Sequence, residues 1–171
     1  MSRLHVCSLA RVHSTVRQSG ARSLVSLINP PLSIDRPEVI AAARHLHLAM
    51  SDIVAPTDGH VLPGEAQVAR LLEFVRRWDR REAVVIHCYA GVSRSTAAAF
   101  IAACTLAPGH PEHAFAQAIR DASPTATPNP LLVALADDLL GRRGRMVAAV
   151  AAIGRGAECF EGVPFALDLP R

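Results

Sequence analysis

The chain of 171 residues contains no lysine, so all 18 of its basic residues are arginines. This absence excludes mechanisms that need a lysine side chain, such as a Walker A nucleotide site, a Schiff base or a pyridoxal phosphate anchor. Aromatic residues make up only 4% of the chain, and the formal net charge is +3. Such a small positive charge does not indicate a nucleic-acid partner.

The chain has few cysteines, and no two of them form a CxxC pair; they are Cys7, Cys88, Cys104 and Cys159. Neither a disulfide framework nor a zinc site is therefore indicated. His45 with His47 and His110 with His113 have spacings that a metal can use, but suitable cysteine or carboxylate neighbours are missing. The sequence also lacks a secretory signal pattern and an apolar run of membrane-spanning length. We expect a cytoplasmic protein.

Half of the residues are apolar, which suits one compact domain over residues 1–171. Short apolar runs predict strands at Leu4–Leu9, Ser23–Ile28, His45–Met50 and Val84–Ile86. Amphipathic or apolar segments predict helices at Glu38–Arg44, Gly64–Arg80, Ser95–Leu106, Pro111–Asp121, Leu131–Leu140 and Arg145–Ile153. The tail from Gly154 has weak periodicity and stays unassigned. This alternation predicts a three-layer α/β/α domain with a central, mostly parallel sheet of four or five strands and helices on both faces.

The chemistry lies in the segment His87-Cys88-Tyr89-Ala90-Gly91-Val92-Ser93-Arg94-Ser95, which connects the strand Val84–Ile86 to a helix. Its cysteine stands at the carboxyl end of a central strand, where α/β sheets place their ligand sites. A tight loop here can turn its backbone N–H groups inward and bind an anion, with Gly91 allowing the chain to curl. The helix amino terminus and Arg94 add positive charge, which favours Cys88 as a thiolate.

These nine residues resemble the HCxxGxxR[S/T] signature of cysteine-dependent protein tyrosine and dual-specificity phosphatases. A chance match in a chain of this length has a probability of roughly one in ten thousand. Further segments are also similar to that family: a strand, helix and strand over Leu4–Ile28, the segments His47–Asp52 and Asp52–Pro56, and the segment from Arg120 through Leu132. The resemblance covers about Leu4 to Leu140 and leaves residues 141–171 outside. It implies a fold like that of protein tyrosine phosphatases.

The resemblance also implies a role for each residue of the signature. Cys88 attacks phosphorus and forms a phosphocysteine, while Ser95 donates a hydrogen bond to the sulfur. His87 orders the loop and supports the thiolate. The phosphate is bound by Arg94 and by the backbone of Tyr89, Ala90, Gly91, Val92, Ser93 and Arg94. No metal ion and no organic cofactor are needed.

The general acid implied by the resemblance is an aspartate on the loop after the strand His45–Met50. Asp52 and Asp58 both lie there, 36 and 30 residues before Cys88. We favour Asp52, because it directly follows the strand and precedes Pro56 at a spacing similar to the family's. Asp58 stands beside Gly59 and is typical of a turn.

The substrate that the resemblance implies is a phosphorylated protein or peptide, with phosphotyrosine first and, in a dual-specificity enzyme, phosphoserine or phosphothreonine second. The uncharged residues Tyr89, Ala90, Val92 and Ser93 speak against an inositol phospholipid, so neither a membrane nor a nucleic acid is expected as partner. Two alternatives stay open: a catalytically weak phosphate-binding module of the same fold, and a rhodanese-like sulfurtransferase, which also carries cysteine in a loop before a helix. The sequence leaves the oligomeric state open.

Overall fold

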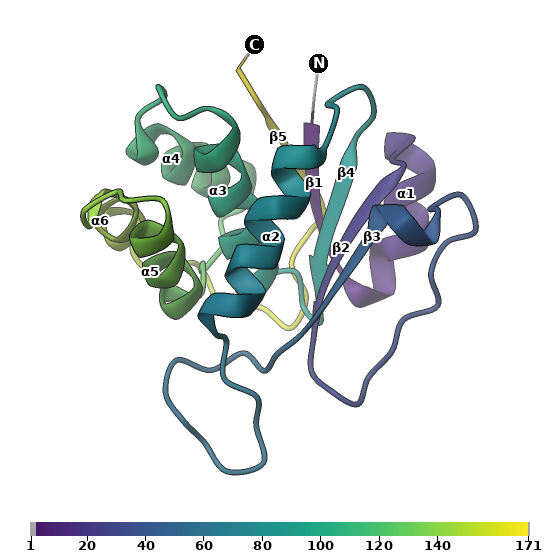
Figure 1. Ribbon diagram of the computed structural model, residues 1–171, viewed down its shortest axis with the longest axis horizontal. Coiled ribbons are helices and arrows are strands. Elements are labelled where there is room, and N and C mark those ends of the chain that lie inside the picture. Colours follow the sequence, from purple (N-terminus) through teal and green to yellow (C-terminus); the bar gives the residue numbers. More distant parts are fainter. Residues whose placement is uncertain (1–2, 171) are drawn as a thin grey trace.

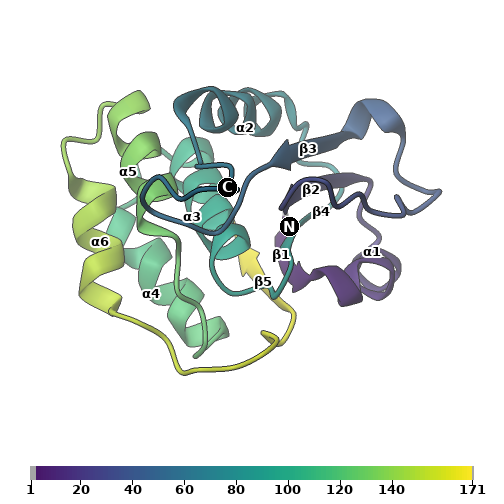
Figure 2. The same ribbon diagram turned by 90° about the horizontal axis from the view of Figure 1, so that it is seen from below.

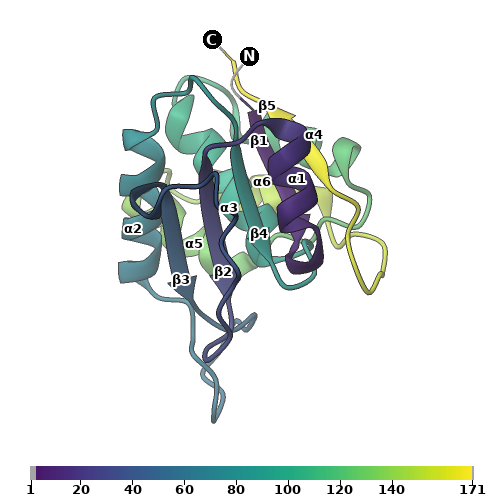
Figure 3. The ribbon, with the colours of Figure 1, turned by 90° about the vertical axis from the view of Figure 1, so that its right-hand side faces the viewer.

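A sheet of five strands forms the centre of the computed structural model, which describes residues 3–170 (Figure 1). The strand order is β3-β2-β4-β1-β5. The strands are β1 (Arg3–Ser8), β2 (Ser23–Ile28), β3 (His45–Ala49), β4 (Val84–Cys88) and β5 (Phe165–Asp168). Strands β1 to β4 are parallel, and β5 lies antiparallel to β1 at the edge of the sheet (Figure 3). The predicted mostly parallel sheet is confirmed.

Helices cover both faces of this sheet, but unequally (Figure 2). Helix α1 (Val12–Ser19) packs on one face, against β1 and β4. The other helices lie on the opposite face, where α2 and α3 pack on the sheet, α4 packs beside α3 and against β5, and α5 and α6 lie outside them. They are α2 (Glu65–Arg77), α3 (Arg94–Leu106), α4 (Glu112–Ala122), α5 (Pro130–Leu139) and α6 (Arg145–Ile153). The predicted three-layer α/β/α architecture is thereby confirmed.

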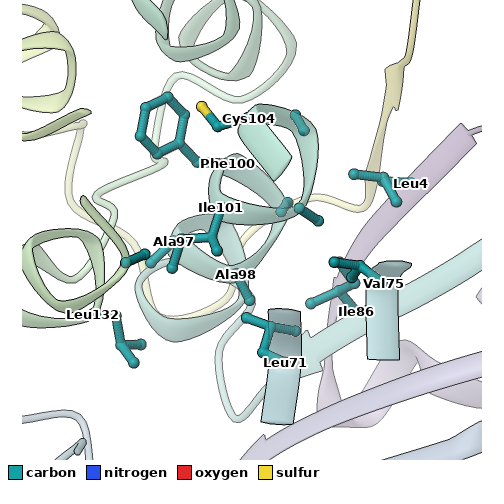
Figure 4. Packing of buried hydrophobic residues seen from close by; sticks show 14 of the residues in the cluster. Leu4, Leu71, Val75, Ile86, Ala97, Ala98, Phe100, Ile101, Cys104 and Leu132 are labelled. Carbon is teal, nitrogen blue, oxygen red and sulfur yellow. The ribbon is translucent and has the colours of Figure 1, made fainter. Parts of the chain in front are cut away.

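The burial of the central elements explains their composition. All residues of β2 and β4 are buried, as expected for parallel strands that helices cover on both faces. Helix α3 is buried from Arg94 to Cys104, because it packs against the sheet on one side and against α2, α4 and α5 on the others. Figure 4 shows side chains of α3 gathered with Leu71 and Val75 of α2 and Ile86 of β4. This core holds the start of α3 rigidly beside the end of β4.

The structure differs from the predicted elements at three places. Only a 3-10 turn at Ala42–Arg44 forms within the predicted helix Glu38–Arg44. Helix α2 ends at Arg77, because Trp78 takes an extended backbone (ψ 121°) and buries its indole, whose Nε1 donates to the carbonyl of Glu82. The unassigned tail contains β5, whose pairing with β1 depends on a partner more than 150 residues away. Among residues 3–170, no helix has the length and apolarity that a membrane span requires.

Candidate active site

The loop Tyr89–Ser93 joins β4 to α3 and places Cys88 at the carboxyl end of the sheet. The Cys88 side chain is buried, and its Sγ lies 3.1 Å from Oγ of Ser95, the second residue of α3. The backbone N–H of Gly91 also donates to this sulfur, with a distance of 3.3 Å between nitrogen and Sγ. Two such contacts stabilise negative charge on the sulfur when the thiol is ionised.

Gly91 is required by the path of the loop. Its φ is +75°, a conformation that residues with a side chain rarely adopt. A Cβ at this position would lie 2.7 Å from the backbone nitrogen of Ser8 and 2.8 Å from the carbonyl carbon of Cys7. The loop therefore turns tightly against the end of β1, and only glycine fits.

The carbonyl groups of the loop are hydrogen-bonded by segments that surround it. The N–H of Leu9 donates to Tyr89 at 3.1 Å, that of Thr127 to Val92 at 2.9 Å, and that of Asn129 to Ser93 at 3.3 Å. In a trans peptide the C=O and the following N–H point in opposite directions. Carbonyl groups bonded to the outside therefore turn the N–H groups of Ala90, Ser93 and Arg94 toward the inside of the loop, as an anion site requires.

Arg94 carries a buried positive charge that pairs with no carboxylate among residues 3–170. The residue is 4% exposed. Its Nη1 donates to the side-chain oxygen of Asn29 at 2.6 Å and to the carbonyl of Met50 at 2.8 Å, and both acceptors are neutral. Its Nε is buried without a hydrogen-bond partner within residues 3–170. Burial of a charge is costly unless it is paired, so this guanidinium is suited to bind an anion.

The structure brings Asp52, and not Asp58, against this loop. Oδ1 of Asp52 accepts hydrogen bonds from Oγ of Ser93 at 2.7 Å and from Nδ2 of Asn129 at 2.9 Å. Asp52 stands at the base of the long loop between β3 and α2 (Figure 1), which Ser51 and Val61 close with a backbone bond of 2.8 Å. Asp58 lies beyond this closure, in a turn with Gly59 at φ +74°.

His87 is fully buried and belongs to a hydrogen-bonded chain across three strands. Its Nε2 lies 2.7 Å from Oγ of Ser26, which in turn lies 2.9 Å from Nε2 of His45. Its Nδ1 lies 3.3 Å from the carbonyl oxygen of Cys88. Burial lowers the pKa of His87 to about 4. The ring is therefore neutral at pH 7, and it reaches the neighbouring Cys88 through the backbone carbonyl group of that residue.

Asn29 and Asn129 were not predicted as site residues. Asn29 stands before two prolines, which indicates only the end of a strand, and its contact with Arg94 spans 65 residues of sequence. Asn129 caps helix α5 by accepting hydrogen bonds from the N–H groups of Leu131 and Leu132. An asparagine before a proline is a helix-start signal. That signal predicts the cap, but the contact with Asp52 has no counterpart in the local sequence.

The family was identified from residues 5–110, which match the family described as "Polymorphic toxin system, DSP-PTPase phosphatase". The chain belongs to this family. A comparison with curated proteins finds no match. The matched residues include the whole loop from Cys88 to Arg94, so the match favours the phosphatase family over the rhodanese-like alternative. The domain is thus a member of the cysteine-dependent phosphatase superfamily.

Solved structures of phosphatases and of a phosphatase-like protein share the fold of this domain. The PTP-2 phosphatase of Cydia pomonella is 22% identical, with a TM-score of 0.61 over 79% of this chain and 84% of its own. Human DUSP28 is 18% identical, with a TM-score of 0.60 over 82% and 89%. The human tyrosine phosphatase-like serine/threonine/tyrosine-interacting protein is 13% identical, with a TM-score of 0.62 over 82% and 92%. These likenesses confirm the predicted fold like that of protein tyrosine phosphatases.

Proposed function

We propose that this phosphatase domain hydrolyses phosphate monoesters on proteins through a phosphocysteine on Cys88. The observation that carries the proposal is the buried guanidinium of Arg94, whose hydrogen-bond partners within residues 3–170 are all neutral and which stands beside the loop Tyr89–Ser93. An anion with several oxygens supplies the missing negative charge and accepts these donors. Phosphate has the required oxygens, and an arginine fork can bind two of them at once.

In the first step, the Cys88 thiolate attacks phosphorus and the bond from phosphorus to the ester oxygen breaks. Arg94 and the backbone N–H groups of the loop bind the three equatorial oxygens and stabilise the charge of the transition state. The departing oxygen takes a proton from Asp52. Because Ser93 and Asn129 both donate to Oδ1 of Asp52, Oδ2 is the oxygen that carries this proton.

In the second step, water attacks phosphorus and the bond from phosphorus to sulfur breaks. Asp52 accepts the proton of the attacking water, so the acid of the first step is regenerated. Ser95 donates a hydrogen bond to the departing sulfur and keeps its proton; the two atoms, Oγ and Sγ, lie 3.1 Å apart. His87 is neutral, and its Nδ1 contacts the carbonyl oxygen of Cys88, so it helps to position the backbone of the nucleophile.

A phosphorylated protein or peptide in the cytoplasm is the substrate that we propose, with phosphotyrosine preferred. The side chains of the loop between Cys88 and Arg94 carry no charge, and the chain contains no lysine to bind further phosphate groups. Tyr89 at the start of the loop is 62% exposed and offers an aromatic surface next to Cys88. We also propose that the chain acts as one domain, since β5 of the tail completes the sheet begun by β1.

Hydrolysis of para-nitrophenyl phosphate tests the proposal. We expect turnover without added metal and in the presence of a chelator. Cys88→Ser abolishes turnover while inorganic phosphate still binds, whereas Cys159→Ser, at an exposed cysteine, retains full activity. Turnover by Cys88→Ala, or its loss on addition of the chelator, overturns the mechanism. Phosphopeptide binding without any hydrolysis supports instead the phosphate-binding module of the same fold, and persulfide formation on Cys88 from thiosulfate supports a sulfur carrier.

A further inference from the structure

The peptide unit between Ala90 and Gly91 is hydrogen-bonded at both ends. Its N–H, from Gly91, donates to Sγ of Cys88 at 3.3 Å. Its C=O, from Ala90, accepts the backbone N–H of Gly162 at 2.8 Å. Since the two groups of a trans peptide point in opposite directions, the bond to Gly162 aims the Gly91 N–H at the sulfur. A hydrogen bond at one end of a peptide also strengthens the bond at the other end.

Gly162 comes from a part of the chain that neither the family match nor the sequence signature includes. The family match ends at residue 110. The carbonyl groups of Tyr89, Val92 and Ser93 are bonded by residues 9, 127 and 129, and Gly162 bonds the carbonyl of Ala90. Of these four carbonyl groups, that of Ala90 belongs to the peptide unit whose N–H donates to the Cys88 sulfur, and its partner comes from the tail.

Both sides of Gly162 are anchored. On its amino-terminal side, Oε1 of Glu161 accepts the hydroxyl of Ser8 at 2.6 Å, and Ser8 is the register partner of Cys88 in the sheet. On its carboxyl-terminal side, β5 pairs with β1. The start of the tail is held by Arg120, which donates to the carbonyl groups of Ile153 and Gly154, both at 3.0 Å. The position of Gly162 is thus determined by the same sheet edge that positions Cys88.

The contact leaves no room for a side chain. A Cβ on Gly162 would lie 2.8 Å from the carbonyl oxygen of Gly91 and 3.3 Å from Cγ2 of Val92. The φ angle of Gly162 lies outside the left-handed region, so its backbone conformation is open to alanine. Gly162→Ala therefore changes the contact with the loop without straining the tail itself.

We propose that Gly162 is a positioning residue of the phosphate-binding loop, which aims the Gly91 N–H at the Cys88 sulfur and at the bound phosphate. The inference deepens the proposed function, on which it rests, and it makes the tail from Gly154 a working part of the active site. Loss of this contact weakens phosphate binding and turnover together, while the sheet and helices stay folded.

Alkylation of Cys88 by iodoacetamide at pH 7, with and without inorganic phosphate, tests the inference independently of turnover. The Cys159→Ser background removes the exposed thiol. Cys7 and Cys104 do not interfere, because burial raises their pKa to about 11 and about 12. Gly162→Ala is compared with Gly109→Ala, whose Cβ meets nothing within 4 Å. Thermal unfolding of each variant is measured beside the alkylation rate, together with kcat and KM on para-nitrophenyl phosphate.

In Gly162→Ala, we expect the phosphate concentration that halves the alkylation rate to rise by about tenfold, the size of one lost hydrogen bond to a charged group. The kcat falls by a similar factor, and Gly109→Ala matches the parent. Unchanged phosphate protection in a folded Gly162→Ala overturns the inference while the proposed function stands. If Gly162→Ala shows weaker phosphate protection than the parent, but the parent hydrolyses no phosphate ester, the inference is supported and the proposed function is overturned.

A second variant covers a failure of Gly162→Ala to fold. Glu161→Ala removes the exposed anchor beside Gly162 without adding any atom. It is expected to weaken phosphate protection by about threefold, which corresponds to a partly released hydrogen bond. Protection equal to that of the parent in Glu161→Ala, or a parent that phosphate does not protect at all, overturns the inference.

Discussion

Asp52 accepts a hydrogen bond of 2.7 Å from the hydroxyl of Ser93, 41 residues further along the chain. This bond joins the loop after β3 to Ser93, the last residue of the loop Tyr89–Ser93 before α3. Asn129 donates to the same carboxylate oxygen and to the carbonyl of Ile53, so the start of α5 holds the aspartate from a second side. The proposed acid is therefore in place in the structure as it stands, next to the loop that binds the proposed substrate.

Replacement of this acid is the first prediction. Asp52→Asn lowers kcat by roughly 10²- to 10⁴-fold, because the leaving oxygen no longer receives a proton. The loss is larger on phenyl phosphate than on para-nitrophenyl phosphate, whose nitrophenolate leaves readily without protonation. Asp58→Asn, at the exposed turn beyond the closure of the loop, keeps the parent activity. Equal losses in the two variants on both substrates would falsify the assignment of Asp52.

A second prediction concerns the neutral partners of Arg94. Asn29→Asp places a carboxylate at the position that lies 2.6 Å from Nη1, so the guanidinium gains an ion-pair partner. The phosphate then has to compete with this internal anion and is repelled by it. We expect the inhibition constant of inorganic phosphate to rise by about a hundredfold in Asn29→Asp. In Asn29→Ala we expect it to rise by about tenfold. Inhibition of product formation by phosphate measures both, and the opposite order contradicts the proposed role of Arg94.

The contact between Ser95 and the sulfur leads to a third prediction. Ser95→Ala removes the donor that stabilises the departing thiolate, so hydrolysis of the phosphocysteine slows by about 10²-fold. Because formation of the intermediate is less affected, a burst of para-nitrophenol precedes a slow steady state in rapid-mixing experiments. Thr105→Ala is the matched control: its hydroxyl lies in the same helix but donates only to the carbonyl of Ile101. A steady state without a burst in Ser95→Ala shows that the hydroxyl has another role.

The buried His87 predicts a loss of stability in acid. Its pKa of about 4 in the folded chain lies below the value of 6.5 expected when unfolded, mainly because of burial. Between these values the unfolded chain binds a proton that the folded chain does not, so the free energy of unfolding falls as the pH drops from 6.5 toward 4. His87→Gln lacks this titration. Between pH 7.5 and pH 5, urea unfolding of the parent loses about 2 kcal/mol more than that of the variant. Parallel pH dependence of the two proteins contradicts the prediction.

Much of the active site was predictable because its residues are contiguous. Cys88, Gly91, Arg94 and Ser95 lie within one strand–loop–helix unit, so their mutual geometry follows from local backbone structure. The buried strands and the helix α3 were predictable for a similar reason, since uniform apolar runs indicate elements covered on both sides. The strand β5 was missed because a four-residue edge strand has little periodicity, and its register is set by β1.

The order of residues along the chain therefore pointed to the proposed nucleophile, to the proposed anion-binding loop and to the layered architecture that presents them. The sequence favoured Asp52 over Asp58, but only the tertiary structure decided its contact with Ser93, gave Arg94 a neutral partner in Asn29, and brought Gly162 to the Ala90 carbonyl. The reason is physical: these are single hydrogen bonds between irregular loops, separated by 41 to 72 residues in the sequence. A periodic pattern reports how one segment meets the core, and it carries no record of which distant loop arrives beside it.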